Sequence, residues 1–168
     1  MPFHRPAFTF CFVCVVSTMT AACSVSSDEA TTTVPPQMPE FTDFATLERP
    51  GSPNSWLIAP AGPSATSPRA DARAPEFNIS AKRLSEDWAA FIGQQPRTRI
   101  LGISDDGLQV EAEQRSTVFG FVDKVSFRAV QLGGAQSTFY AYSRSQTGYW
   151  DLGVNRKRLQ DWVAALQP

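Results

Sequence analysis

Histidine and cysteine are nearly missing from this sequence, and the few that occur lie within the first 23 residues. The only histidine is His4, and the three cysteines are Cys11, Cys14 and Cys23. From residue 24 onward the chain lacks the side chains for Ser-His-Asp or Cys-His catalysis, for the common zinc sites and for histidine-ligated haem. We therefore expect no cofactor and no metal.

The chain has no excess of charge of one sign, because 15 Lys and Arg residues face 16 Asp and Glu residues. Nucleic-acid-binding domains usually present a strongly basic surface, so no nucleic-acid partner is expected. The glycine patterns G-x-x-x-x-G-K and G-x-G-x-x-G, which are typical of nucleotide sites, do not occur either.

A long hydrophobic run is also missing. The apolar stretch from Ala7 to Met19 has 13 residues, whereas a helix needs roughly 20 to cross a bilayer. It follows the polar and basic residues His4 and Arg5 and ends in small residues up to Ala22, which is the layout of a secretory signal peptide. Residues 1–22 are therefore predicted to be a signal peptide.

The signal peptide ends in Thr20-Ala21-Ala22-Cys23, which resembles the lipobox of bacterial lipoproteins. The resemblance implies that Cys23 is acylated and that a lipid anchor joins the protein to a membrane. Thr20 departs from the pattern, which usually has Leu there, and ordinary cleavage near Ala22 or an uncleaved anchor are the alternatives. Because Ser24 is not Asp, analogy favours the outer membrane over the inner one. We expect the protein in the bacterial cell envelope, on the periplasmic face of a membrane.

Beyond the cysteine, residues 24–40 consist mainly of Ser, Thr, Pro, Asp and Glu and offer almost nothing to a core, so residues 23–40 are predicted to be a tether. The 17 residues from 24 to 40 reach up to about 50 Å when extended. A single globular domain is predicted for residues 41–168, which is long enough to bury a core without disulfides.

Residues 41–168 are predicted to fold as a two-layer α+β domain. Apolar residues at helical spacing predict helices over about 81–94, with Ser80 as N-cap, and over about 154–166. Alternating apolar residues and turn residues between the helices predict four strands in an antiparallel meander, with both helices on one face of that sheet. The run Ser55–Ala59 is predicted to be an edge strand or a packed loop, and residues 61–74 a second loop.

Pairs of carboxylates occur twice, and neither pair is predicted to be catalytic. Asp105 and Asp106 precede Gly107 between two strand-like runs, which is the composition of a tight turn. Glu111 and Glu113 lie on the polar side of an alternating strand, and we expect that side to be solvated.

The densest polar segment lies between the last predicted strand and the last helix. One interpretation is a pocket for an oxyanion or carboxylate, because guanidinium, hydroxyl and helix N–H groups meet there. Its candidate ligand-binding residues are Arg115, Arg144, Ser145, Asp151, Asn155 and Arg158. The alternative interpretation is structural: Arg144 pairs with Asp151, Asp151 caps the helix, and the remaining basic residues are solvated. Tyr149 and Trp150 either line a ligand cleft, rest on a membrane surface or close the end of the core.

Several motifs in residues 48–167 resemble the family of uncharacterised proteins called domain of unknown function 1499. They are Arg49-Pro50-x-Ser52-Pro53-Asn54, Ala74-Pro75-x-Phe77, Arg115-Ser116 with Phe119-Gly120-Phe121-x-Asp123-x-Val125, and Ser143-Arg144-Ser145-x-x-Gly148-x-x-Asp151-Leu152-Gly153-Val154-Asn155-Arg156-x-Arg158. Trp56 stands where many members have a cysteine. The resemblance implies that the polar residues belong to one recurring constellation and that the domain is envelope-associated, but it implies no activity.

We therefore expect an uncharacterised bacterial envelope lipoprotein whose domain binds a partner without catalysis. An anionic small molecule or another envelope protein is the expected partner. The alternative is an enzyme that works through Asp, Arg and Ser groups, with Asp151 or Asp123 as acid–base and Arg144 stabilising negative charge.

Overall fold

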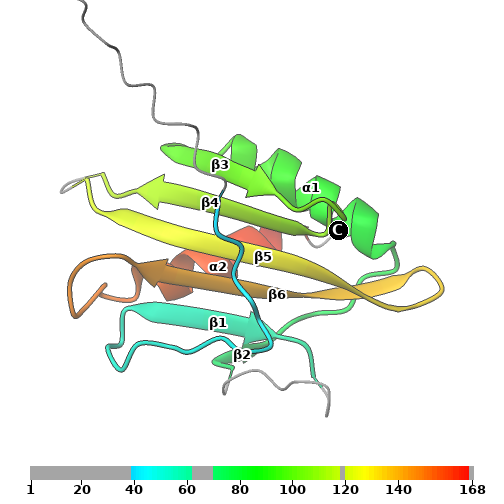
Figure 1. Ribbon diagram of the computed structural model, residues 1–168, viewed down its shortest axis with the longest axis horizontal. Helices are drawn as coiled ribbons and strands as arrows, with labels where there is room; N and C mark the ends of the chain where they lie inside the picture. The colour runs from blue at the N-terminus through cyan, green and yellow to red at the C-terminus, as the bar shows by residue number, and fades with distance from the viewer. Residues whose placement is uncertain (1–38, 62–69, 118–119, 167–168) are drawn as a thin grey trace, which may run out of the picture. The chain divides into compact units, whose positions relative to one another are not determined.

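The computed structural model describes residues 39–61, 70–117 and 120–166, which form one β-sheet and two helices (Figure 1). Residues 36–168 cluster as one compact unit. The predicted signal peptide, Cys23 and nearly all of the predicted tether lie outside the described residues.

The sheet has six strands in the spatial order β2-β1-β6-β5-β4-β3. Neighbouring strands are antiparallel, except that β1 and β2 are parallel. In chain order the strands are β1 (Ser55–Ala59), β2 (Ala72–Arg73), β3 (Thr98–Ile103), β4 (Gln109–Arg115), β5 (Val122–Gly133) and β6 (Gln136–Ser145).

The α+β class is confirmed, but the predicted sheet of four strands is too small. The meander is present as β3 to β6, and β1 adds to it by pairing with β6, where Ser55 lies opposite Arg144. This pairing joins segments far apart in the chain, so no local pattern could assign β1 a partner. β1 is not an edge strand, because β2, which falls inside the predicted loop 61–74, lies outside it.

The predicted turn at Asp105-Asp106-Gly107 is confirmed. Gly107 donates its N–H to the carbonyl of Ser104 at 2.7 Å and has a φ of 65°, a region that favours glycine. Asp106 accepts hydrogen bonds from the Ser104 hydroxyl at 2.5 Å, from the Leu108 N–H at 2.9 Å and from Arg128 at 2.9 Å. These donors, the Ser104 hydroxyl foremost, lower the pKa of Asp106 to about 2.

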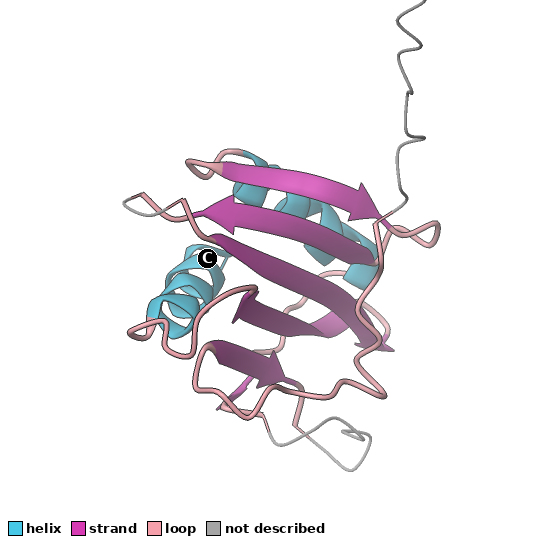
Figure 2. Cartoon of the chain, turned by 60° about the vertical axis from the view of Figure 1, so that its left-hand side comes forward, coloured by secondary structure: helices cyan, strands magenta, loops and turns pink. Residues whose placement is uncertain are grey.

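Two helices, α1 (Ala81–Gly93) and α2 (Val154–Leu166), lie on the same face of the sheet (Figures 1 and 2). Both were predicted almost to the residue, and Ser80 caps α1 by accepting the Arg83 N–H. Their apolar sides enclose the main core, in which Trp88 stacks on Phe127 with ring centroids 4.4 Å apart.

The opposite face of the sheet is crossed by the segment that precedes β1. We call residues 39–50 the strap, and it runs in cyan over the strands in Figure 1. Phe44 of the strap packs with Leu57 and Tyr142 in a second, smaller apolar cluster, and its ring stacks on Tyr140 with centroids 5.2 Å apart. The strap therefore divides the second face into covered and open areas.

Candidate binding site

Four of the six candidate residues lie together where β6 leads into α2. Asp151 accepts the backbone N–H groups of Gly153 and Asn155, each at 2.9 Å, and so caps α2 as the structural interpretation predicted. The Asn155 amide donates to Asp151 at 2.7 Å and to the Ser145 hydroxyl at 3.1 Å.

Asn155 also joins α2 to the sheet. Its side chain is fully buried, and its amide nitrogen donates to the carbonyl oxygen of Asn54 at 2.9 Å. Its amide oxygen accepts from the Ser143 hydroxyl at 2.6 Å. Asn54 in turn donates to the carbonyl oxygen of Gly148 at 2.6 Å, which fixes the loop before α2.

Arg158 and Asp123 form a buried ion pair with an N–O distance of 2.5 Å and side-chain exposures of 4% and 5%. The remaining guanidinium N–H groups donate to Gln114 at 2.6 Å, Ser143 at 2.8 Å and Asn155 at 2.7 Å. A buried charge of this kind becomes costly when its partner is removed. Because its hydrogen bonds are made internally, this network fastens α2 to β4, β5 and β6.

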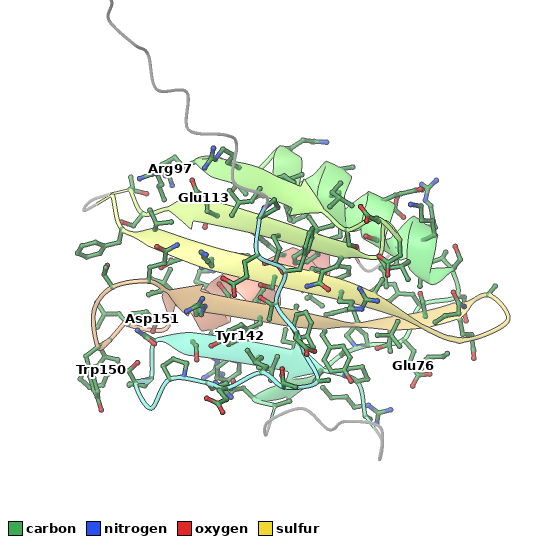
Figure 3. The ribbon with its side chains drawn as sticks, viewed as in Figure 1. Glu76, Arg97, Glu113, Tyr142, Trp150 and Asp151 are labelled. Carbon is green, nitrogen blue, oxygen red and sulfur yellow. The ribbon has the colours of Figure 1, made fainter. Side chains whose placement is uncertain are left out.

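The structure does not bring Arg144 and Arg115 into that network. Successive side chains of a strand point to opposite faces, so Ser143 and Ser145 face α2 while Arg144 faces the strap side. The Arg144–Asp151 pair of the structural interpretation is absent among the described residues, because Asp151 bonds to the start of α2 at the end of the sheet (Figure 3). Arg115 is 58% exposed and lies 3.7 Å from Glu113.

Glu111 is buried, and the prediction of a solvated face is wrong for this residue. Its carboxylate accepts hydrogen bonds from the Thr42 N–H at 2.9 Å, the Ser126 hydroxyl at 2.6 Å and the Gln109 amide at 2.9 Å. The strap covers this part of β4 and supplies one of the donors, which strand alternation alone cannot reveal.

A cleft of about 340 Å³ lies between the strap and the sheet. Its sheet side is lined by Glu111, Lys124, Tyr142 and Arg144, from β4, β5 and β6. The strap lines the other side with Glu40, Phe41, Thr42, Asp43, Thr46, Leu47 and Glu48. Of the residues predicted to bind a ligand, this cleft contains Arg144.

Three side chains of the cleft are hydrogen-bond donors that have no acceptor among the described residues. Lys124 and Arg144 are cross-strand partners, and neither side chain forms an ion pair or hydrogen bond within the part of the chain that the structure describes. Like charges in this position repel each other. Tyr142 is 2% exposed, and its hydroxyl is buried without a hydrogen-bond partner among the described residues. A buried, unsatisfied hydroxyl costs about 1–3 kcal/mol.

Two of the four carboxylates that line the cleft are already engaged. Asp43 accepts the Ala45 N–H and the Thr46 hydroxyl, each at 2.9 Å, and the Ala45 N–H is the main cause that lowers the pKa of Asp43. Glu111 is held by the strap and by β4 and β5. Four acids and two basic groups thus line the cleft. Asp43 and Glu111 are engaged, whereas Glu40 and Glu48, like Lys124 and Arg144, form no side-chain ion pair or hydrogen bond among the described residues.

Two further searches of the described residues give negative results. They contain no group of three His, Cys, Asp or Glu side chains placed to hold a metal ion. None of their helices combines the length and the apolar character needed to cross a membrane.

Comparison with protein families matches residues 20–166 to the family described as "Protein of unknown function (DUF1499)". The chain belongs to the DUF1499 family. The match spans the strap, every strand and both helices, and it confirms the family resemblance of the sequence motifs. No curated protein and no solved structure matches the chain. Because the DUF1499 family has no known function, its ligand must be inferred from the residues that line the cleft.

Sequence reasoning missed two residues of the DUF1499 cleft, Lys124 and Tyr142. Lys124 shares a motif region with Asp123, but only the pairing of β5 with β6 places it opposite Arg144. Tyr142 alternates with Ala141 and Ser143, which shows its face but not the strap above it. The alternation of side chains along each strand could have identified the face on which both residues lie. Nothing in the sequence indicated that the strap covers that face.

Proposed function

We propose that this protein is a lipid-anchored envelope protein whose DUF1499 domain binds an anionic group in the cleft between strap and sheet, without catalysis. The observation that supports this most is a set of three side-chain donors that have no acceptor in residues 39–61, 70–117 and 120–166: Lys124, Arg144 and the Tyr142 hydroxyl. A carboxylate or phosphate would accept hydrogen bonds from all three.

The chemistry of the three donors suits a small anion with an oxygen-bearing head. A guanidinium binds a carboxylate or phosphate through two parallel N–H groups, and an ammonium adds a point charge. Arg144 is exposed and would meet the ligand first, whereas Tyr142 is buried and would hydrogen-bond its innermost oxygen. A volume of about 340 Å³ is within the range of small-molecule sites.

The positions of the acids support binding over catalysis. Asp123 and Asp151, the acid–base candidates, are engaged in the network on the α2 side of the sheet, while Arg144 faces the strap. A general acid or base must lie within hydrogen-bond distance of the atom to which it gives a proton or from which it takes one. The proposed enzyme groups therefore do not share one cavity.

The lipid anchor rests on Thr20-Ala21-Ala22-Cys23 and the preceding apolar stretch. We propose acylation at Cys23 and, because Ser24 follows it, placement in the outer membrane facing the periplasm. Metabolic labelling with a fatty acid should mark the wild-type chain and leave Cys23→Ser unlabelled. Equal labelling of both chains would contradict acylation at this residue.

Ligand binding is tested by thermal unfolding of the chain from Ser24 onward. A ligand at 100 times its dissociation constant adds about 2.7 kcal/mol of stability. Inorganic phosphate, glycerol phosphate and citrate are suitable probes. At least one should raise the melting temperature of the wild type and fail to do so for Arg144→Gln and Lys124→Gln.

Arg83→Gln is the matched control, because it removes one positive charge from the exposed side of α1. It should respond to the anion as the wild type does. Equal stabilisation of all four proteins would mean that the anion acts outside the cleft, and no stabilisation by any anion would contradict the proposed function.

A further inference from the structure

The loop before α2 and the first residue of α2 expose large apolar side chains to solvent. Tyr149, Trp150, Leu152 and Val154 are 71%, 72%, 89% and 47% exposed, respectively. Of the three roles considered for Tyr149 and Trp150, closing the end of the core is therefore excluded. We call residues 149–154 the apolar loop, and Trp150 marks its position in Figure 3.

The protein holds this loop in a fixed conformation. Asp151 bonds to the backbone at the start of α2, and the carbonyl of Gly148, directly before the loop, accepts a hydrogen bond from Asn54. Leu152 has a φ of 55°, which is unusual for a residue other than glycine. These bonds hold apolar side chains turned toward water, and a cluster of exposed apolar side chains is typical of an interaction site.

The groove beside the apolar loop contains two basic residues, Arg49 and Arg156, and two acids, both of which are engaged within the protein. Arg156 lies on the first turn of α2 and packs over Trp56 at 5.0 Å from the ring centroid, and a shallow groove joins Arg156 to Trp150. Arg97 is exposed at the same end of the sheet (Figure 3). Of the nearby acids, Asp123 is buried against Arg158, Asp71 is paired with Arg49, and Asp151 accepts backbone N–H groups at the start of α2.

We propose that the apolar loop inserts into the interface of a bilayer with anionic headgroups, as a contact additional to the anchor at Cys23. Trp and Tyr favour the boundary between headgroups and acyl chains, where their rings are buried and their polar atoms stay hydrated. Leu152 supplies aliphatic surface below them, and Arg156 meets the anionic headgroups. The argument does not depend on the cleft or on its ligand.

The length of the preceding chain permits this contact. Residues 24–40 comprise 17 residues, which span up to about 50 Å when extended. An anchor at Cys23 would raise the local concentration of the domain at the membrane surface, so that a weak second contact is sufficient. This contact would fix the orientation of the domain, because it always turns the same end of the sheet toward the lipid.

The test measures vesicle binding of the chain from Ser24 onward, which lacks the proposed anchor and keeps the whole sheet, both helices and both apolar clusters. It should sediment with phosphatidylglycerol vesicles and at least tenfold less with phosphatidylcholine vesicles. A double variant, Trp150→Ser with Leu152→Ser, should lower the partition coefficient at least tenfold.

The matched control replaces two half-exposed apolar side chains outside this loop, with Ile103→Ser and Leu132→Ser. It should bind phosphatidylglycerol vesicles as the wild type does. Absence of wild-type binding, or equal binding of the apolar-loop variant, would overturn the proposal. A dimer in sedimentation equilibrium that the apolar-loop variant abolishes would also overturn it, because a second copy would then cover the loop.

A second measurement is lipid quenching of tryptophan fluorescence, and its one variant is a conservative replacement of an exposed side chain. Brominated phosphatidylglycerol quenches only nearby indoles. Trp88 and Trp162 are buried in the core, and Trp56 is half-buried beneath Arg156, so Trp150 is the most exposed indole of the four. The wild type should be quenched, and Trp150→Phe should lose most of that quenching. An unquenched wild type would contradict insertion at this loop.

Discussion

Lys124 and Arg144 lie directly opposite each other on β5 and β6, on the face that the strap crosses. Each would be more stable beside a carboxylate, but neither has an ion-pair partner within the described residues. The buried hydroxyl of Tyr142, from the same strand as Arg144, also lacks a partner there. Their common cleft is the basis of the proposed anion site.

Arg144→Gln should change the free energy of unfolding by less than about 1 kcal/mol, because Arg144 is exposed and holds no structural bond among the described residues. Urea denaturation of wild type and variant measures this. A loss of several kcal/mol would mean that Arg144 supports the fold and would remove it from the binding site.

Arg158→Ala should destabilise the protein by about 3–5 kcal/mol, because it leaves Asp123 buried without its counter-charge. The double variant Arg158→Met with Asp123→Leu should recover part of that loss, since no charge is then left unpaired. The urea midpoints of the wild type, the single variant and the double variant test whether Arg158 and Asp123 stabilise the protein as a pair. A single variant as stable as the wild type would contradict the role of the network in fastening α2.

Tyr142→Phe should keep or raise stability, by up to about 1 kcal/mol, because it removes a buried hydroxyl that has no partner among the described residues. It should also weaken the stabilisation by the anion, since one donor is lost. Tyr140→Phe, on the same face of β6, is the control and should keep the anion response. A clear loss of unliganded stability in Tyr142→Phe would show that the hydroxyl is bonded.

Asp106 gives a prediction about acid stability. Its pKa in the folded protein is lowered to about 2 from 3.8, so the charged form stabilises the folded state above pH 3.8. That contribution falls as the pH drops toward about 2, and the free energy of unfolding should fall with it. In Asp106→Asn this slope should be shallower, and equal slopes would contradict the assignment. The effect is small because the side chain is 44% exposed.

Local patterns predicted the helices, the hairpin turn and the meander because each depends on neighbours in the chain. The N-cap at Ser80 and the turn at Gly107 are local in this sense. Strand alternation also separates Arg144 from Ser143 and Ser145, although the sequence interpretation placed Arg144 and Ser145 in one pocket.

The position of β1, the burial of Glu111 and the cleft could not be predicted, because they depend on contacts between segments far apart in the sequence. Thr42 bonds to Glu111, and Ser55 lies opposite Arg144, and neither relationship has a periodic signature in the sequence. The strap has no regular secondary structure, so its position over the sheet could not be predicted from hydrophobic periodicity. That position buries Glu111 and forms the roof of the cleft.

A crystal structure of the domain, grown with an anion that raises its melting temperature, tests the central claim most directly. We predict density for the anion in the cleft, within hydrogen-bond distance of Lys124, Arg144 and the Tyr142 hydroxyl. An anion bound elsewhere with the cleft unoccupied, or Lys124 and Arg144 paired with the protein's own carboxylates, would contradict the account.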